Sequence, residues 1–173
     1  MYSAIMIAQE IDNGKINIGI VDSIQSEILN EQRNIWVYVP NRPPNSGERF
    51  PVVYLLDGDG HFPSVVGMIR QLSTTNGNTV VPEMIVVGIP NTDRMRDLTP
   101  SKDTSIGPEN TSGGGEAFLN FMSEELIPYI DTNYPTAPYR LFIGHSLGGL
   151  TVLNAFLKHP EMFNAYIAID PSL

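Results

Sequence analysis

Hydrophobic residues occur in short runs along the chain, and three of these runs are apolar at nearly every position. They cover residues 51–56 (PVVYLL), 83–90 (EMIVVGIP) and 139–144 (YRLFIG), and a fourth strand-like run follows at 164–170 (NAYIAID). Continuous apolar strands are typical of a parallel sheet that helices cover on both faces. The pattern therefore predicts four strands of such a sheet.

Two runs nearer the N-terminus have a different pattern. Residues 15–24 and 27–40 are rich in isoleucine and valine, with partial alternation of apolar and polar positions. Alternation with a period of two is typical of a strand with one face in the core and one in solvent. We expect these two runs to form an antiparallel pair ahead of the parallel strands.

The clearest helix covers residues 115–134, where apolar residues recur at steps of three and four. These residues are Phe118, Phe121, Met122, Leu126 and Ile130. Pro128 is expected to kink this helix or shift its end, because proline lacks the amide hydrogen. Further helices are predicted at 64–73 and Leu147–Lys158, and a long irregular stretch at 91–115.

Strands and helices alternate along the chain, which predicts an α/β fold with a mainly parallel sheet flanked by helices. A length of 173 residues fits one domain, residues 1–173. In such sheets ligands bind beyond the carboxyl ends of the strands. Four segments fall at these ends, namely residues 57–60, 91–94, 144–149 and 170–173.

One of these segments contains Gly144-His145-Ser146-Leu147-Gly148, a G-x-S-x-G pattern between a predicted strand and a predicted helix. This context is the one in which a serine nucleophile is held at a strained turn. Glycines are needed at both ends, because a side chain would collide with the neighbouring strand or helix. Ser146 Oγ would enter the cleft, and the Leu147 amide would face a developing oxyanion. The alternative is an ordinary glycine-rich helix start.

A second oxyanion donor is expected in the loop after the strand that neighbours the Ser146 strand. Residues 55–62 (LLDGDGHF) fit this place, and Gly58 and Gly60 would allow the amide of Asp59 to face the cleft. A plain Asp-Gly turn is the other interpretation. A calcium loop is excluded, because the third ligand position is not acidic and no glutamate stands at the required distance.

A general base for Ser146 is hard to find among the three histidines. His159 lies 13 residues farther along (159 minus 146), which is roughly 20 Å at 1.5 Å per helical residue. His145 is adjacent to Ser146 and is expected to point away from its hydroxyl. His61, on the correct edge, either lines the pocket, acts as the base or forms local hydrogen bonds. Asp170 ends a strand at this edge as a candidate acid, although a helix or turn cap is the favoured interpretation.

Composition limits the partners. The absence of cysteine excludes disulfides, thiolate zinc sites and cysteine nucleophiles. A net charge of −9, with 10 Lys and Arg, disfavours nucleic acid and acidic membrane surfaces. No apolar run reaches the ~20 residues of a membrane span and no signal-peptide pattern is evident, so we expect a soluble protein, with the cytoplasm slightly favoured. We expect no metal and no organic cofactor.

Two arginines in the irregular stretch do not decide whether the substrate carries an anionic group. Arg94 and Arg96 either meet an anionic group on the acid side of a substrate or, as the favoured interpretation, pair with Asp93 and Asp97 in solvent.

Several segments together resemble one protein family. They are YLLDGDGHF (54–62), GIPNTDRMRDLTP (88–100), FLNFMSEELIPYID (118–131) and the stretch from Leu141 to Leu173. In these motifs the chain resembles the putative-esterase branch of the α/β-hydrolase superfamily, which includes enterochelin-esterase-like enzymes and S-formylglutathione hydrolases. The likeness extends from about Glu27 to the end of the chain.

The resemblance implies an α/β-hydrolase fold and a serine hydrolase that cleaves small carboxylic esters through an acyl-enzyme. Ser146 matches the nucleophile of the family, and Leu147 and Asp59 match its oxyanion amides. The family's acid and histidine follow the strand that matches 164–170. We therefore expect an N-terminal portion without the C-terminal strands and helices, weakly active or inactive alone.

An incomplete sheet is also expected to self-associate through its exposed edge, or to bind a missing C-terminal segment. Two other functions stay open. One is a binding module with an α/β-hydrolase fold and no catalysis, and the other is an acyltransferase of the same family.

Overall fold

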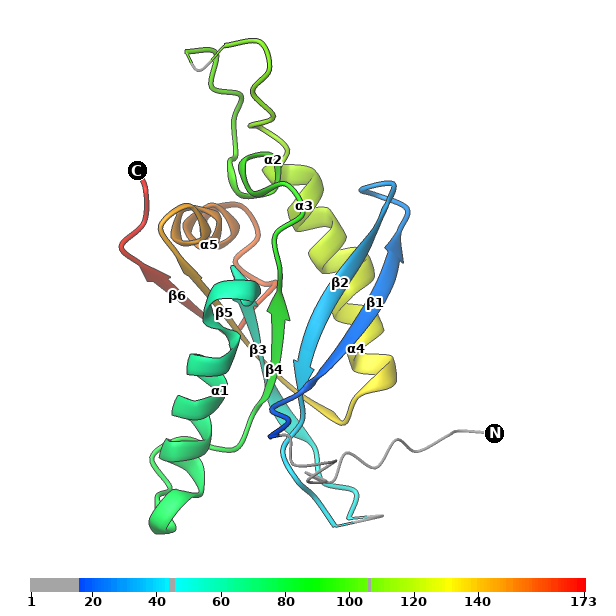
Figure 1. Ribbon diagram of the computed structural model, residues 1–173, viewed down its shortest axis with the longest axis vertical. Helices are drawn as coiled ribbons and strands as arrows, with labels where there is room; N and C mark the ends of the chain where they lie inside the picture. Colours follow the sequence, from blue (N-terminus) through cyan, green and yellow to red (C-terminus); the bar gives the residue numbers. More distant parts are fainter. Residues whose placement is uncertain (1–15, 44–45, 106) are drawn as a thin grey trace.

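The computed structural model describes residues 16–43, 46–105 and 107–173. Its centre is a six-stranded sheet with the strand order β1-β2-β4-β3-β5-β6 (Figure 1). The strands are β1 (Ile20–Ser26), β2 (Glu31–Tyr38), β3 (Phe50–Leu56), β4 (Ile85–Ile89), β5 (Thr136–His145) and β6 (Ala165–Ile169). The predicted α/β fold with a mainly parallel sheet is confirmed.

The sheet contains an antiparallel and a parallel part. The β1–β2 and β2–β4 pairs are antiparallel, whereas the β4–β3, β3–β5 and β5–β6 pairs are parallel. The expected opening pair is confirmed, although residues 27–30 form a turn rather than strand, with Asn30 at a φ of 51°. Lys15 of the first predicted strand lies outside the described residues.

Helices cover both faces of the sheet (Figure 1). On one face α1 (Gly58–Ser73) packs against β3, β4 and β5 through Phe62, Val66 and Ile69. On the other face lie α5 (Leu147–Lys158) and the helix that begins at Gly115, and these bury the larger core cluster. Because helices cover both faces of the sheet, the carboxyl ends of the parallel strands are the expected place for a ligand-binding or active site.

Helix α1 begins six residues earlier than the predicted helix 64–73. Asp57 adopts a left-handed conformation (φ 52°, ψ 44°) that turns the chain from β3 directly into the helix. Gly58, Gly60 and Pro63 are poor helix formers, which is why the sequence reads as a loop here. Burial of Phe62, which is only 3% exposed, outweighs these local preferences. A short 3₁₀ turn, η1 (Thr75–Gly77), follows α1.

The predicted helix 115–134 consists of three consecutive elements. These are α3 (Gly115–Phe121), a π-helical turn η2 (Met122–Leu126) and α4 (Ile127–Asn133). All five apolar residues predicted for its inner face are at most 1% exposed. The wider turn precedes Pro128, and the Ile127 amide bonds to the Met122 carbonyl, so the helix accommodates the proline and continues to Asn133.

The irregular stretch 91–115 contains one short helix that the sequence did not predict, α2 (Arg94–Leu98). The Asp93 carboxylate caps it by accepting a 3.0 Å hydrogen bond from the Arg96 amide. Thr151 of α5 donates a 2.9 Å hydrogen bond to the Leu98 carbonyl. The start of the irregular stretch is therefore fixed against α5.

Strand β6 is the last strand of the sheet on one side. Ile167 and Ile169 on it are 43% and 48% exposed. Among the described residues, no helix combines the length and the hydropathy needed to cross a membrane.

Candidate active site

Ser146 stands between the end of β5 and the start of α5 with an unusual backbone conformation, φ 56° and ψ −118°. Residues other than glycine rarely adopt a positive φ. Such a strained backbone conformation persists only where the surrounding structure stabilises it. Here the Ser146 amide donates to the Ile169 carbonyl at 3.0 Å. The Ser146 carbonyl accepts from the amides of Leu150 and Ser172 at 3.0 and 3.1 Å. These bonds join the turn to α5 and to the segment after β6.

The two glycines of the motif stand where the backbones are in close contact. A Cβ atom on Gly144 would lie 2.3 Å from the Gly148 carbonyl oxygen. A Cβ atom on Gly148 would lie 3.1 Å from Asp57 Oδ2, and one on Gly149 would lie 3.0 Å from the Ile169 carbonyl oxygen. The close approach expected around Ser146 is therefore present.

Ser146 Oγ has one hydrogen-bonding side chain within the described residues. That partner is Ser172 Oγ, at 3.0 Å. The sequence placed residues 170–173 at this edge but did not single out Ser172, because a lone serine after a strand carries no signal of its own. The neighbouring Asp170, at φ 43°, is exposed and its carboxylate accepts no hydrogen bond in the described ranges, so the expected cap is absent there.

The segment after β3 lies beside the Ser146 turn. Leu55 pairs with Ile143 in the β3–β5 register, and three residues farther along each strand lie Gly58 and Ser146. The expected loop is in fact the first turn of α1, so Asp59 is the second residue of a helix rather than part of a loop. The first amides of a helix have no partner within it, which leaves the Asp59 amide free to donate. The register thus brings it to the same edge as the Leu147 amide.

Asp57 joins this segment to the one after β4. Its carboxylate accepts from Arg94 Nε at 2.6 Å, from Arg94 Nη2 at 3.0 Å and from Asn91 Nδ2 at 2.7 Å. Burial alone would raise the pKa of Asp57, but these hydrogen bonds and the charge of Arg94 outweigh it and hold the pKa below its ordinary value. Since Asp57 Oδ2 also lies close to Gly148, three of the four segments predicted at this edge are in contact.

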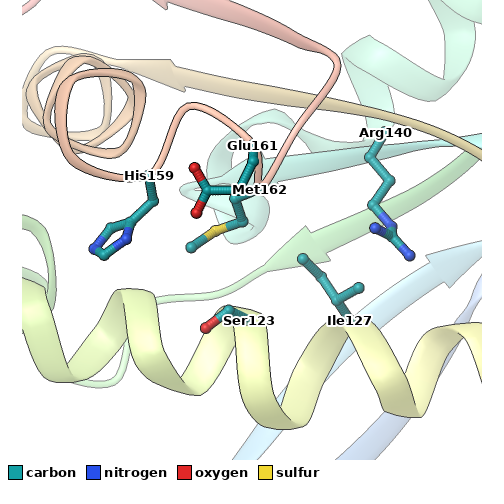
Figure 2. A pocket seen from close by; sticks show the side chains of 6 residues that line it. All are labelled: Ser123, Ile127, Arg140, His159, Glu161 and Met162. Atoms are coloured by element: carbon teal, nitrogen blue, oxygen red, sulfur yellow. The ribbon is translucent and has the colours of Figure 1, made fainter.

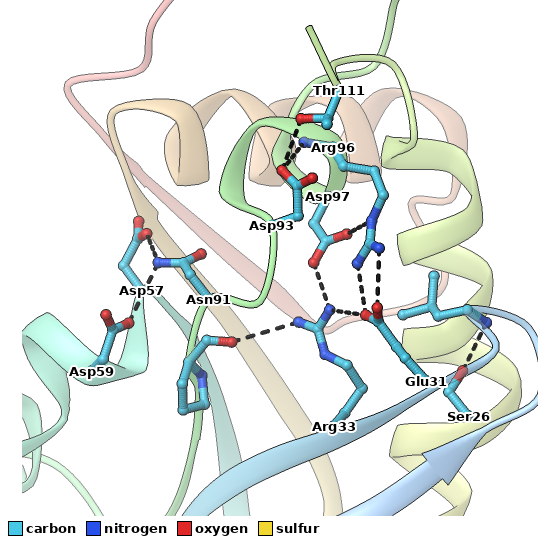
Figure 3. A network of polar contacts seen from close by, with 12 residues as sticks. Ser26, Glu31, Arg33, Asp57, Asp59, Asn91, Asp93, Arg96, Asp97 and Thr111 are labelled. Atoms are coloured by element: carbon cyan, nitrogen blue, oxygen red, sulfur yellow. Dashed lines mark hydrogen bonds and ion pairs between the residues drawn. The ribbon is translucent and has the colours of Figure 1, made fainter. Parts of the chain in front are cut away.

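Arg96 belongs to a separate network that connects α2 to β2 (Figure 3). Its guanidinium donates to both carboxylate oxygens of Glu31 at 3.0 and 2.6 Å and to Asp97 at 2.7 Å. Arg33, only 1% exposed, donates to Asp97 at 2.6 Å. The favoured expectation was that both arginines pair with Asp93 and Asp97 in solvent. It is wrong for Arg94, whose side chain pairs with Asp57. It is partly right for Arg96, which pairs with Asp97 but also with Glu31.

None of the three histidines is hydrogen-bonded to Ser146 Oγ. The rings of His61 and His145 meet edge to face, with centroids 5.9 Å apart. His159 caps the far end of α5, and its Nε2 lies 3.2 Å from Glu116 Oε1. The described chain therefore presents a serine and candidate oxyanion amides without a histidine partner for the serine.

A pocket of about 230 Å³ lies at the opposite end of α5 from Ser146. Figure 2 shows side chains from the helix starting at Gly115, from β5 and from the turn after α5 around it. Its lining residues are Ser123, Ile127, Arg140, His159, Glu161 and Met162. The described residues contain no group of three or more His, Asp or Glu side chains arranged to hold a metal ion.

Comparison with known proteins points to a single group. Residues 26–172 match the family described as "Putative esterase". The chain is 34% identical over 161 residues to the ferri-bacillibactin esterase BesA of Bacillus subtilis, an alignment that covers 83% of this chain and 55% of that protein. It is 31% identical to a siderophore enterobactin esterase of Emericella nidulans, which covers 74% of this chain and 48% of the relative.

Solved structures show the same likeness. An IroE-like serine hydrolase from Shewanella oneidensis superposes with a TM-score of 0.83 at 34% identity, over 90% of this chain and 51% of that one. The siderophore hydrolase EstB from Aspergillus nidulans gives 0.73 at 26% identity, over 91% and 59%. The chain spans about half the length of the curated relatives it matches.

Proposed function

The chain belongs to the "Putative esterase" family, and on this basis we propose that it carries the nucleophile and oxyanion hole of a serine hydrolase of carboxylic esters. Ser146 is the nucleophile, and the amides of Leu147 and Asp59 are the oxyanion donors. The observation that carries this proposal is the strained backbone of Ser146 between β5 and α5, because such strain has a role when it presents a reactive hydroxyl.

In the proposed reaction Ser146 Oγ attacks the ester carbonyl while its proton passes to a general base. The carbonyl oxygen becomes an oxyanion and, in this proposal, accepts hydrogen bonds from the Leu147 and Asp59 amides. Collapse of the tetrahedral intermediate breaks the ester C–O bond, and the alcohol leaves with the proton from the base. Water then attacks the acyl-enzyme by the same steps, which frees the acid and Ser146.

The base and its acid come, in this proposal, from polypeptide outside the 173 residues. This is supported by the position of the histidines, since His159 is at the far end of α5 and the His61 and His145 rings contact each other edge to face. It is also supported by the relatives, which are about twice as long as the stretch they share with this chain. Without its general base, the serine supports only a residual rate of hydrolysis, several orders of magnitude below the full rate.

The proposed substrates are ester-linked siderophores. The relatives named above are a ferri-bacillibactin esterase and an enterobactin esterase, and a third, from Aspergillus fumigatus, is a triacetylfusarinine C esterase. These names describe those proteins, and their shared chemistry is hydrolysis of an ester in a siderophore.

Hydrolysis assays on the full-length gene product test this proposal. Ferri-bacillibactin, enterobactin and triacetylfusarinine C are offered beside p-nitrophenyl acetate, and Ser146→Ala is the matched variant. We expect at least one siderophore to be hydrolysed, with a rate at least ~1,000-fold lower in the variant. Activity on p-nitrophenyl acetate alone would contradict the substrate class, and full activity of Ser146→Ala would contradict the mechanism.

A further inference from the structure

We propose that Asp57 is the positioning residue for the oxyanion hole, because hydrogen bonds to its carboxylate hold the segment that carries the Asp59 amide, and the same carboxylate lies against the first turn of α5. This inference rests on the proposed function, since it assigns a role relative to the Ser146 site. The proposed role of Asp57 involves no contact with substrate or nucleophile. It acts through the backbone on either side of it.

The backbone of Asp57 determines where the Asp59 amide points. Asp57 ends β3 and precedes α1, and its left-handed conformation (φ 52°, ψ 44°) makes the sharp change of direction between them. Aspartate tolerates this conformation better than most residues, but the conformation is still strained and needs external support. A change of φ or ψ at Asp57 would rotate the whole first turn of α1, including the Asp59 amide.

Three hydrogen bonds supply that support from the segment after β4. Arg94 Nε and Nη2 donate hydrogen bonds of 2.6 and 3.0 Å to the two carboxylate oxygens of Asp57. Asn91 Nδ2 donates a third, of 2.7 Å. Paired bonds between a guanidinium and a carboxylate fix orientation as well as position. Figure 3 shows the Asn91 amide between the carboxylates of Asp57 and Asp59. The Asp57 side chain is 10% exposed, so water competes little for these bonds.

The same carboxylate lies against the elbow helix. A Cβ atom on Gly148 would come within 3.1 Å of Asp57 Oδ2 and 3.3 Å of Leu56 Cβ. The first turn of a helix favours a negative charge, so an ionised Asp57 is well placed there. The lowered pKa of Asp57, set by hydrogen bonds that outweigh burial, keeps it ionised at neutral pH. Leu147 is the residue before Gly148 and Asp59 is the second residue after Asp57, so the two proposed donors belong to the two segments that this carboxylate brings together.

The test uses Asp57→Asn and Arg94→Lys in the full-length gene product. Asparagine preserves the size of the side chain but removes its charge and one acceptor, and lysine preserves the charge but removes the paired bonds. We expect kcat per active site to fall ~10- to 100-fold in Asp57→Asn, because one oxyanion donor is worth ~100- to 1,000-fold and is displaced rather than removed. KM should change less than ~3-fold, because the contact is gained in the transition state.

Two readouts separate positioning from simple loss of stability. Active sites are counted by complete reaction with a fluorophosphonate, so that kcat refers to folded protein only. Affinity for a boronic acid that mimics the tetrahedral intermediate should weaken in parallel with kcat/KM. The matched control is Arg96→Lys, on the same helix, which disturbs the bonds to Glu31 and Asp97 and should leave kcat per site unchanged.

The proposal is overturned if Asp57→Asn and Arg94→Lys keep kcat per site and boronic acid affinity within ~2-fold of the wild type, or if Arg96→Lys loses as much kcat as Arg94→Lys. If Asp57→Asn fails to fold, Arg94→Lys alone decides, because it leaves Asp57 in place. Failure of the proposed function looks different, since the wild-type protein itself would then show no fluorophosphonate adduct on Ser146.

Discussion

Ser146 occupies a conformation that its neighbours impose. Gly144 allows β5 to come close to α5, and Gly148 allows α5 to come close to the end of β3. The amide of Ser146 is held by the Ile169 carbonyl. The sequence predicted this turn because glycine spacing reflects a local steric requirement. It did not predict Ser172 beside Ser146 Oγ, because that contact depends on how the end of β6 packs against the turn.

Gly144→Ala tests the close packing at this turn. The added Cβ would stand 2.3 Å from a backbone oxygen of α5, so the helix itself would have to move. We expect a loss of about 3 kcal/mol or more in the free energy of unfolding, together with loss of reactivity at Ser146. Chemical denaturation and fluorophosphonate labelling measure the two effects.

Gly67→Ala is the matched control, because a Cβ at this position in α1 meets nothing within 4 Å. It should stabilise the protein by ~0.5–1 kcal/mol through helix propensity and leave labelling unchanged. An equal effect of both substitutions would contradict the steric account of Gly144.

At the scale of elements, α2 is held to β2 by buried charges. Arg33 and Asp97 have side chains that are 1% and 3% exposed and lie 2.6 Å apart. The Arg33 guanidinium also lies over the rings of Phe118 and Phe121, at 5.6 and 5.7 Å from their centroids. Hydrogen bonds from Arg96, outweighing burial, and from Arg33 lower the pKa of Glu31, which completes the network.

Asp97→Ala should destabilise the protein by about 3 kcal/mol, because it leaves Arg33 buried with less compensating charge. Chemical denaturation measures this change. The control is Lys158→Met, which breaks an exposed pair with Glu116 and should cost less than about 1 kcal/mol. Similar losses of unfolding free energy in the two variants would contradict the claim that removing a partner from the buried Arg33–Asp97 pair costs more than breaking an exposed pair.

The elements themselves were predictable to different degrees. Continuous apolar runs identified β3, β4 and β5, and the three- and four-residue spacing of apolar residues identified the helix from Gly115, because both patterns reflect burial. Helix α5 was predicted from its position after the G-x-S-x-G pattern, and β6 from a strand-like run that is half exposed. The start of α1 was missed, since Gly58, Gly60 and Pro63 argue locally against a helix that tertiary packing of Phe62 stabilises. Short α2 was missed because five residues carry too little periodicity.

At the scale of the molecule, the predicted edge of the sheet gathers the candidate site. Three of its four segments meet through Asp57, and the fourth meets Ser146 through Ser172. Topology alone predicts that strand ends converge. The pairing of Asp57 with Arg94 could not be predicted, because two residues 37 positions apart in the sequence are joined only by the fold.

The candidate base is the part of the site that the described chain does not provide. Strand β6 ends the sheet with Ile167 and Ile169 exposed, and relatives contain about as much polypeptide again. Self-association through this edge, or binding of a further segment there, stays a prediction.

Reaction of the full-length gene product with a fluorophosphonate, followed by intact mass measurement and peptide mapping, tests directly whether Ser146 is a nucleophile. We expect a single adduct on Ser146, absent from the Ser146→Ala variant. No adduct, or an adduct that forms on another residue and survives in Ser146→Ala, would contradict the claim that this turn presents the nucleophile of an esterase.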